Sequence, residues 1–252
     1  MDFSFDFYFV ALVAMRLTGC VMFNPILGRR NIPMMLRSGI IVVLTIFVCS
    51  VTPVQQVNIV GLLDFFVCVA KELLLGFIIG LIIRMFFSIV NISGEVIDMQ
   101  IGLSMAKAYD SQTESQSTVT TSLLNIMYMM VFFVSNGHVT LMRVITQTAI
   151  FVPYDQLSIN IGSFEQVIEL FSLILLYSVK LTLPILAIEL ITEMGVGMLM
   201  RAVPQINVFI INLQLKVFLG LLSIWLLVPA FSAFFERMVE LMFDNIQHIM
   251  GI

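Results

Sequence analysis

Hydrophobic stretches dominate the chain, and short polar segments separate them. A membrane-spanning helix needs about 20 mostly apolar residues. Six stretches approach or exceed this length: residues 3–23, 38–51, 62–90, 122–152, 167–191 and 206–235. A final amphipathic stretch covers residues 236–249. The pattern predicts an all-α membrane protein with about six spans.

Helix-breaking residues interrupt several of these stretches. Residues 122–152 are broken at Asn136-Gly137-His138, and Pro184 and Pro229 lie inside the last two stretches. In lipid every backbone polar group must be bonded internally, so such breaks are tolerated where the chain is buried in protein or lines a wet cavity. We therefore expect long, kinked, hairpin-forming helices that pack against other subunits.

Ionisable residues occur in or beside nearly every stretch. Such residues are costly in a membrane and usually face a partner or a cavity. We expect buried or interface positions for the following charged residues: Arg16, Lys71, Glu72, Glu95, Asp98, Lys180, Glu189, Arg201 and Lys216. Others lie at span ends and extend to the interface, an alternative that suits Arg84 and Arg143 best.

The longest polar stretch covers residues 91–121. Residues 92–106 alternate apolar and polar positions at helical spacing, which predicts a short amphipathic helix. Residues 110–118 contain no apolar residue and are predicted to form a loop. Such a loop is usually an ordinary connector, although moving elements are found in the same kind of position.

Composition and motifs exclude several classes of function. Hydrophobic residues make up 60% of the chain and charged residues 11%, against about 25% charged in soluble domains. The net charge of −4 and the lack of a basic stripe argue against nucleic acid as a partner. The sequence lacks a P-loop, a metalloprotease motif and a nucleophile elbow, so we expect no enzyme activity, metal or cofactor. Glu95 and Asp98 are expected to form a solvated or ion-paired helix face rather than a catalytic pair.

Small residues mark positions where helices approach closely. Gly76 and Gly80 form a GxxxG pair, and Gly102 with Ala106 repeats the small-residue spacing. A polar break that includes Pro204 separates the last two stretches, which predicts a helical hairpin.

Five segments resemble the flagellar biosynthetic protein R (FliR) family, and their order and spacing extend over essentially the whole chain. They are Arg16 with residues 24–33 and Arg37; residues 71–81; residues 94–103 running into 110–113; residues 136–138; and residues 201–209 with Lys216. At position 111 the family usually has proline, and this chain has Ser111.

The resemblance implies a core subunit of the flagellar type III export gate, in the bacterial inner membrane at the flagellar basal body. Its implied partners are the P-type and Q-type gate subunits, the B-type switch subunit, unfolded export substrates and membrane lipid. It also implies a P-type-like half at 1–160, a Q-type-like hairpin at 161–252 and a closing loop at 104–118. The gate residues expected there are Ser104, Lys107, Tyr109, Asp110, Gln112, Thr113 and Glu114, with helix packing at Gly76, Gly80, Gly102 and Pro204.

Two other functions remain open at this point. One is the equivalent subunit of an injectisome, whose proteins are related to the flagellar ones. The other is a self-contained secondary transporter with Lys71, Glu72, Lys180 and Glu189 as a coupling network, because broken spans near the middle of the membrane are also typical of transporters.

Overall fold

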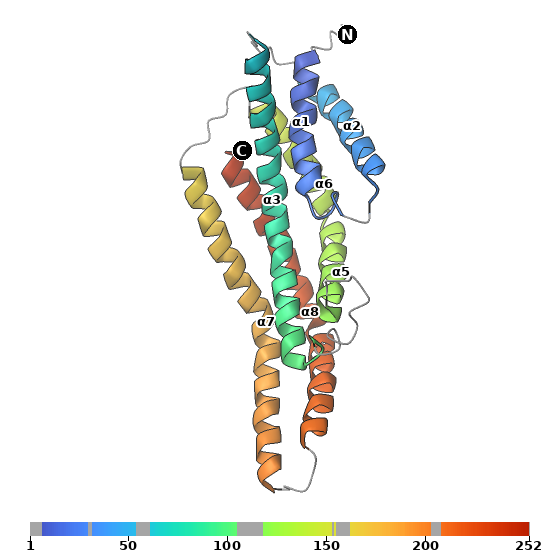
Figure 1. Ribbon diagram of the computed structural model, residues 1–252, viewed down its shortest axis with the longest axis vertical. Coiled ribbons are helices and arrows are strands. Elements are labelled where there is room, and N and C mark those ends of the chain that lie inside the picture. Colours follow the sequence, from blue (N-terminus) through green and yellow to red (C-terminus); the bar gives the residue numbers. More distant parts are fainter. Residues whose placement is uncertain are drawn as a thin grey trace. The chain divides into compact units, whose positions relative to one another are not determined.

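The computed structural model describes residues 7–29, 32–53, 61–104, 118–152, 154, 162–202 and 208–251. Within these ranges the chain forms seven helices and no strand (Figure 1). The helices are α1 (Phe7–Phe23), α2 (Met34–Val51), α3 (Leu62–Ile101), α5 (Val119–Val134), α6 (Gly137–Phe151), α7 (Gly162–Ala202) and α8 (Val208–Met250). The all-α prediction is confirmed.

Four helices are long and apolar enough to cross a membrane: α2, α3, α7 and α8. Helices α5 and α6 pass the same test together but are bent by 67° at their junction. The bend lies at the predicted break, where Asn136 adopts the left-handed conformation with φ 57°. Asparagine is one of the few non-glycine residues that adopt this conformation readily.

Helix α3 is longer than the sequence pattern indicates. The prediction of a separate amphipathic helix at 92–106 is wrong, because α3 continues without a break to Ile101. It ends where Gly102 takes a φ of +91° and its amide bonds to the carbonyl of Asp98 at 3.1 Å. A glycine with positive φ just past the last turn is a common way to end a helix. The amphipathic stretch 236–249 is likewise the last part of α8.

The chain divides into two compact units. Unit 1 comprises Met1–Phe86, Asn136–Leu170 and Glu240–Ile252, and unit 2 comprises Phe87–Ser135 and Phe171–Val239. The boundaries fall within α3, α7 and α8 and between α5 and α6. The predicted division into a P-type-like half at 1–160 and a Q-type-like hairpin at 161–252 is a different one, and it stays a prediction.

In unit 1, the backbones of α1 and α3 are in contact, and α2 lies beside α1 (Figure 1). A Cβ atom added at Gly76 would lie 1.9 Å from the carbonyl oxygen of Arg16, and one added at Gly19 would lie 2.4 Å from that of Leu73. Only glycine fits such an approach, because the clash is with backbone rather than with a movable side chain. This contact brings Arg16 of α1 next to the α3 segment that contains Glu72.

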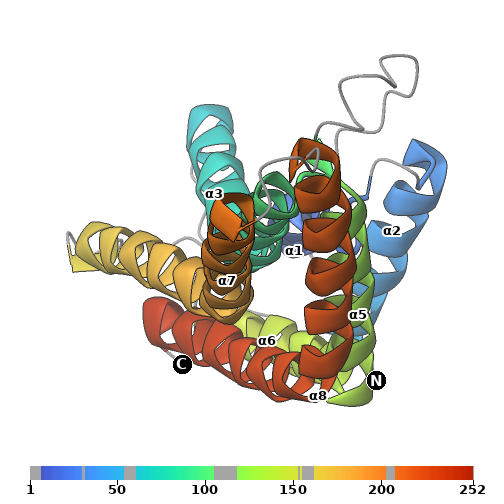
Figure 2. The same ribbon diagram turned by 90° about the horizontal axis from the view of Figure 1, so that it is seen from below.

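In unit 2, α3 packs on α5, and α5 packs on α8 (Figure 2). Gly94 makes the first contact close, since an added Cβ would lie 2.6 Å from the Cα of Thr121. The ring of Tyr128 on α5 lies 4.7 Å from that of Phe87 and 5.4 Å from that of Phe235, between ring centroids. These aromatic contacts tie three helices to one core.

Candidate functional site

Arg16 and Glu72 form a buried ion pair in unit 1. Arg16 Nε donates to Glu72 Oε2 at 2.6 Å, and the two residues are 4% and 1% exposed. Arg16 also donates to the carbonyl oxygens of Thr148 at 2.7 Å and Val152 at 3.3 Å. These carbonyls belong to the C-terminal end of α6, where a helix leaves its last acceptors without internal partners. One guanidinium therefore joins α1 to α3 and caps α6.

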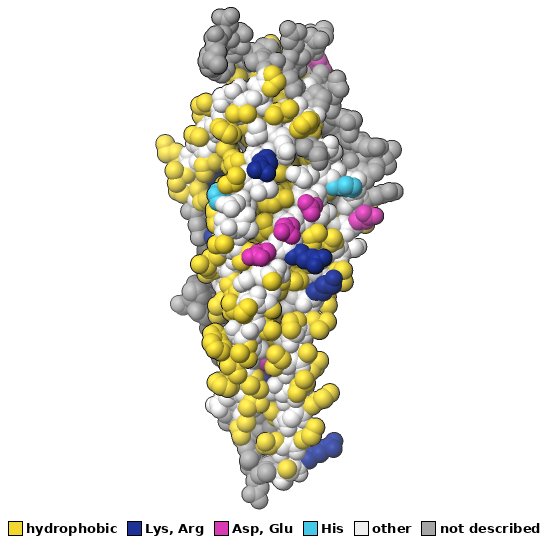
Figure 3. All heavy atoms as spheres, turned by 180° about the vertical axis from the view of Figure 1, so that it is seen from behind, with side chains coloured by type: hydrophobic (Ala, Val, Ile, Leu, Met, Phe, Trp, Pro, Cys, Tyr) yellow, Lys and Arg dark blue, Asp and Glu magenta, His cyan; other side chains and the backbone are white. Residues whose placement is uncertain are grey.

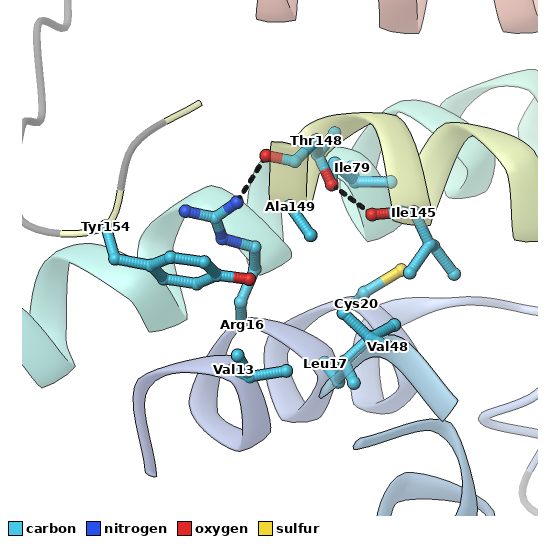
Figure 4. Close-up of a pocket in the computed structure, with 10 residues that line it drawn as sticks. All are labelled: Val13, Arg16, Leu17, Cys20, Val48, Ile79, Ile145, Thr148, Ala149 and Tyr154. Atoms are coloured by element: carbon cyan, nitrogen blue, oxygen red, sulfur yellow. Dashed lines mark hydrogen bonds between the residues drawn. The ribbon is translucent and has the colours of Figure 1, made fainter. Parts of the chain in front are cut away.

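Tyr154 completes the surroundings of Arg16. The guanidinium carbon lies 4.1 Å from the centroid of the Tyr154 ring (Figure 4). Phe9 packs edge-on against that ring, with 5.2 Å between ring centroids. Burial raises the pKa of Tyr154 to about 12, against the opposing effect of the Arg16 charge. The phenol thus stays neutral at physiological pH, and Glu72 supplies the negative charge that balances Arg16.

The cavity beside Arg16 is too small for a ligand. Its volume is about 10 Å³, and Cys20, Ile79, Ile145 and Thr148 are among the residues that line it (Figure 4). A single buried water molecule needs about this much space. We therefore interpret the Arg16 cluster as a structural centre that fixes three helices.

In unit 2, Asp98 of α3 caps the start of α5. Its Oδ2 accepts the backbone N–H of Thr120 at 3.0 Å, and its Oδ1 accepts the hydroxyl of the same residue at 2.5 Å. Thr120 lies in the first turn of α5, whose amides have no partners within the helix. A carboxylate is favourable there because the helix dipole is positive at this end. The contact holds together the described residues on either side of the predicted closing loop.

Other polar residues of α3 also bond to neighbouring helices of unit 2. Ser93 Oγ donates to the carbonyl oxygen of Ser178 on α7 at 3.0 Å, and Asn125 on α5 donates to Asn91 Oδ1 at 2.7 Å. Asn91, Ser93 and Asp98 thus form bonds between helices. Asp98 is fully buried and hydrogen-bonded, which agrees with its expected buried position and not with a solvated face. Glu95 is exposed, which agrees with a solvated face and not with burial within this chain.

Unit 2 also contains an ion pair, which joins the two arms of the C-terminal hairpin. Lys216 Nζ of α8 pairs with Glu193 Oε1 of α7. Glu189 lies one helical turn before Glu193 and is 0% exposed. Lys216, which was expected at a buried or interface position, therefore has its acidic partner, Glu193, within this chain.

An apolar groove lies between α5 and α8 of unit 2. Its volume is about 440 Å³, and its lining is almost entirely apolar, with Val119, Leu123, Ile126, Leu221 and Trp225 among the residues. Trp225 is 71% exposed. Hydrophobic side chains also cover much of the described surface of the face in Figure 3, and the charged side chains gather in a few places.

Comparison with known proteins decides the family. The model for bacterial export proteins, family 1, matches residues 7–242.

The chain belongs to the bacterial export proteins, family 1.

Relatives of this export protein extend over nearly its whole length. It is 25% identical to the flagellar biosynthetic protein FliR of Escherichia coli (strain K12), covering 98% of this chain and 93% of the relative. It is 24% identical to FliR of Bacillus subtilis (strain 168), covering 96% and 94%. It is also 26% identical to the Yop proteins translocation protein T of Yersinia pestis, covering 81% and 80%.

The structure places the remaining predicted residues of this export protein in varied surroundings. Lys71 is half-buried, and Arg201 is exposed. Lys180 is exposed, with its ammonium 5.1 Å from the centroid of the Tyr177 ring. A Cβ added at Gly80 would lie 3.0 Å from that of Phe23.

Most of the predicted gate residues lie outside the described part of this export protein. Ser104 is described and half-buried. The gate and packing residues outside the described ranges are Lys107, Tyr109, Asp110, Gln112, Thr113, Glu114 and Pro204. Their roles stay predictions.

Sequence reasoning missed several partners that the fold of this export protein supplies. They are Gly19, Thr120, Thr148, Tyr154 and Glu193. The Glu189–Glu193 spacing of one helical turn was a usable signal, because it places two acids on one face of a helix. Thr148 contributes a backbone carbonyl to Arg16, and residue types carry no signal for a backbone contact.

Proposed function

We propose that the chain is a non-enzymatic core subunit of the flagellar type III protein-export gate, and that it helps to form and close the channel for unfolded export substrates. The observation that carries this proposal is the family match over residues 7–242, together with FliR relatives matched over more than nine-tenths of both lengths. Membrane-crossing helices support a location in a membrane, which we propose to be the bacterial inner membrane at the flagellar basal body.

The exposed surface of unit 2 supports the proposal of partner chains. In the most apolar 18-residue stretches of α7 and α8, 28% and 22% of the residues are buried. Large apolar side chains such as Ile191, Met194, Phe218 and Trp225 are exposed. Surfaces of this kind become covered by lipid or by other chains. We propose P-type and Q-type gate subunits as the covering chains, with the B-type switch subunit as a further partner.

The flagellar version of the gate is better supported than the injectisome version. Seven of the relatives found are named flagellar biosynthetic protein FliR, at 23–29% identity, and one is named Yop proteins translocation protein T, at 26%. The resemblance of residues 110–113 to the flagellar pattern agrees with this choice.

The transporter hypothesis is less well supported. It requires Glu72 to act in a coupling network with Lys71, Lys180 and Glu189. Glu72 is instead bonded to Arg16 in the buried ion pair of unit 1. Glu72 therefore already has a structural role, and the family relatives are named for flagellar biosynthesis and Yop translocation.

We further propose residues 104–118 as the closing element of the channel. Support comes from the segments on either side, because the end of α3 and the start of α5 are held together through Asp98 and Thr120. An element between two fixed ends returns to the same place after a substrate has passed.

Deleting residues 110–117 tests this closing role. We expect cells with the assembled variant to leak ions or small solutes, because the polar side chains that block the channel are missing. Membrane permeability is measured at matched amounts of assembled complex. The control replaces the same residues with a glycine-serine segment of equal length, which is expected to leak as well if side chains make the seal. An intact membrane barrier in the deletion variant would count against the closing role.

A further inference from the structure

The carboxyl group of Glu189 is buried, and none of the described residues donates a hydrogen bond to it. The residue is 0% exposed, and neither Oε1 nor Oε2 accepts a hydrogen bond in the described part of the chain. An ionised carboxylate only accepts hydrogen bonds. A buried charge without donors is strongly unfavourable, and such a group usually takes its neutral form.

Charge balance around Glu189 points the same way. Among the described residues, the charged groups that act on it are Lys216 of α8 and Glu193 of its own helix. Lys216 already pairs with Glu193. Two carboxylates thus share one ammonium, and an ionised Glu189 would leave one negative charge uncompensated in an apolar hairpin.

Because the carboxyl group of Glu189 is buried within this chain, a small ligand can reach it more easily than the side chain of another subunit. This chain's own atoms bury both carboxyl oxygens. A lysine or arginine of another subunit would have to displace those atoms to reach the oxygens. A metal ion also fits poorly, because no three His, Cys, Asp or Glu side chains gather to hold one within the described ranges.

We propose that Glu189 is a proton-binding site inside the C-terminal hairpin. A proton taken from water converts the carboxylate to a neutral carboxylic acid, while Lys216 remains paired with Glu193. When the proton returns to water, the new carboxylate competes for Lys216. Glu193, whose side chain is 42% exposed, then becomes hydrated. Binding one proton thus decides which acid of α7 is paired with α8, and this inference does not depend on the proposed function.

Infrared spectroscopy of the membrane-embedded protein tests the inference. The full chain is produced with ¹³C-labelled glutamate, so that glutamic acid side chains have a shifted carbonyl stretch. We expect a band of protonated glutamic acid at neutral pH. The band should be missing from Glu189→Gln and unchanged in Glu240→Gln, which alters an exposed acid of α8. Glu189→Gln should accumulate normally, because glutamine has the shape and charge of the protonated acid.

Two results would overturn the inference. One is the lack of a protonated-glutamate band in the wild-type protein, as expected if Lys216 or a partner's cation holds an ionised Glu189. The other is a band that persists in Glu189→Gln. If that variant does not accumulate, Glu189→Asp serves instead, because it keeps a carboxyl group but removes the labelled residue. The labelled band must then disappear for the inference to stand.

Discussion

Replacing Glu72 with alanine is expected to remove most of the folded protein from the membrane. The change leaves the Arg16 guanidinium buried without its counter-charge. Abandoning one member of a buried ion pair costs about 3–5 kcal/mol, which is a large share of a typical folding free energy of about 5–15 kcal/mol. The measurement is the amount of chain extracted in a mild detergent as a single, non-aggregated species.

Two further variants show whether a lower yield of Glu72→Ala comes from breaking the Arg16–Glu72 pair or simply from removing a carboxylate. Glu240→Ala removes an exposed carboxylate and should leave the yield unchanged. Arg16→Met combined with Glu72→Leu removes both charges and should recover part of the yield, because no charge is left unpaired. Recovery should be incomplete, since the carbonyls of Thr148 and Val152 lose their donor. A normal yield of Glu72→Ala would contradict the structural role of the pair.

Replacing Gly76 with alanine is the second change expected to have a large effect. The new methyl group would lie 1.9 Å from the carbonyl oxygen of Arg16, so α1 and α3 must move apart. Overpacking of this kind typically costs about 1–3 kcal/mol, and a clash with backbone belongs at the upper end. The separation also disturbs the Arg16–Glu72 pair beside it. Thermal denaturation in detergent should show a marked drop in the midpoint.

Gly39→Ala is the matched control for this change. Gly39 lies in α2, and an added Cβ would meet no atom within 4 Å. Alanine is better than glycine within a helix by about 1 kcal/mol, so this variant should be neutral or slightly stabilised. Equal effects of the two substitutions would show that the α1–α3 contact is less close than described.

The helices were largely predictable from sequence because long apolar runs leave a membrane chain few alternatives to helix. The break at Asn136-Gly137 was also predictable, since both residue types favour a turn. The end of α3 was missed because the polar residues 91–98 resemble a surface. Three of them, Asn91, Ser93 and Asp98, bond to α5 or α7, and a single-helix pattern does not distinguish water from a neighbouring helix as the partner.

The candidate site was predictable by residue type but not by pairing. Arg16 and Glu72 stand out as charges in apolar runs, yet their pairing depends on Gly19 and Gly76 bringing α1 against α3. Lys216 stands out in the same way, whereas its partner Glu193 was overlooked in favour of Glu189. Pairing is decided by tertiary contacts among residues far apart in sequence, which composition and spacing leave open.

The proposed function is that of one subunit of a membrane-embedded export gate. Its most direct test is to purify an affinity-tagged chain from its own membranes in mild detergent and to determine the composition of the complex by native mass spectrometry. We expect smaller hydrophobic proteins in fixed stoichiometry with the tagged chain, and loss of these partners from the Glu72→Ala variant. A stable monomer that transports a solute on its own in liposomes would contradict the account.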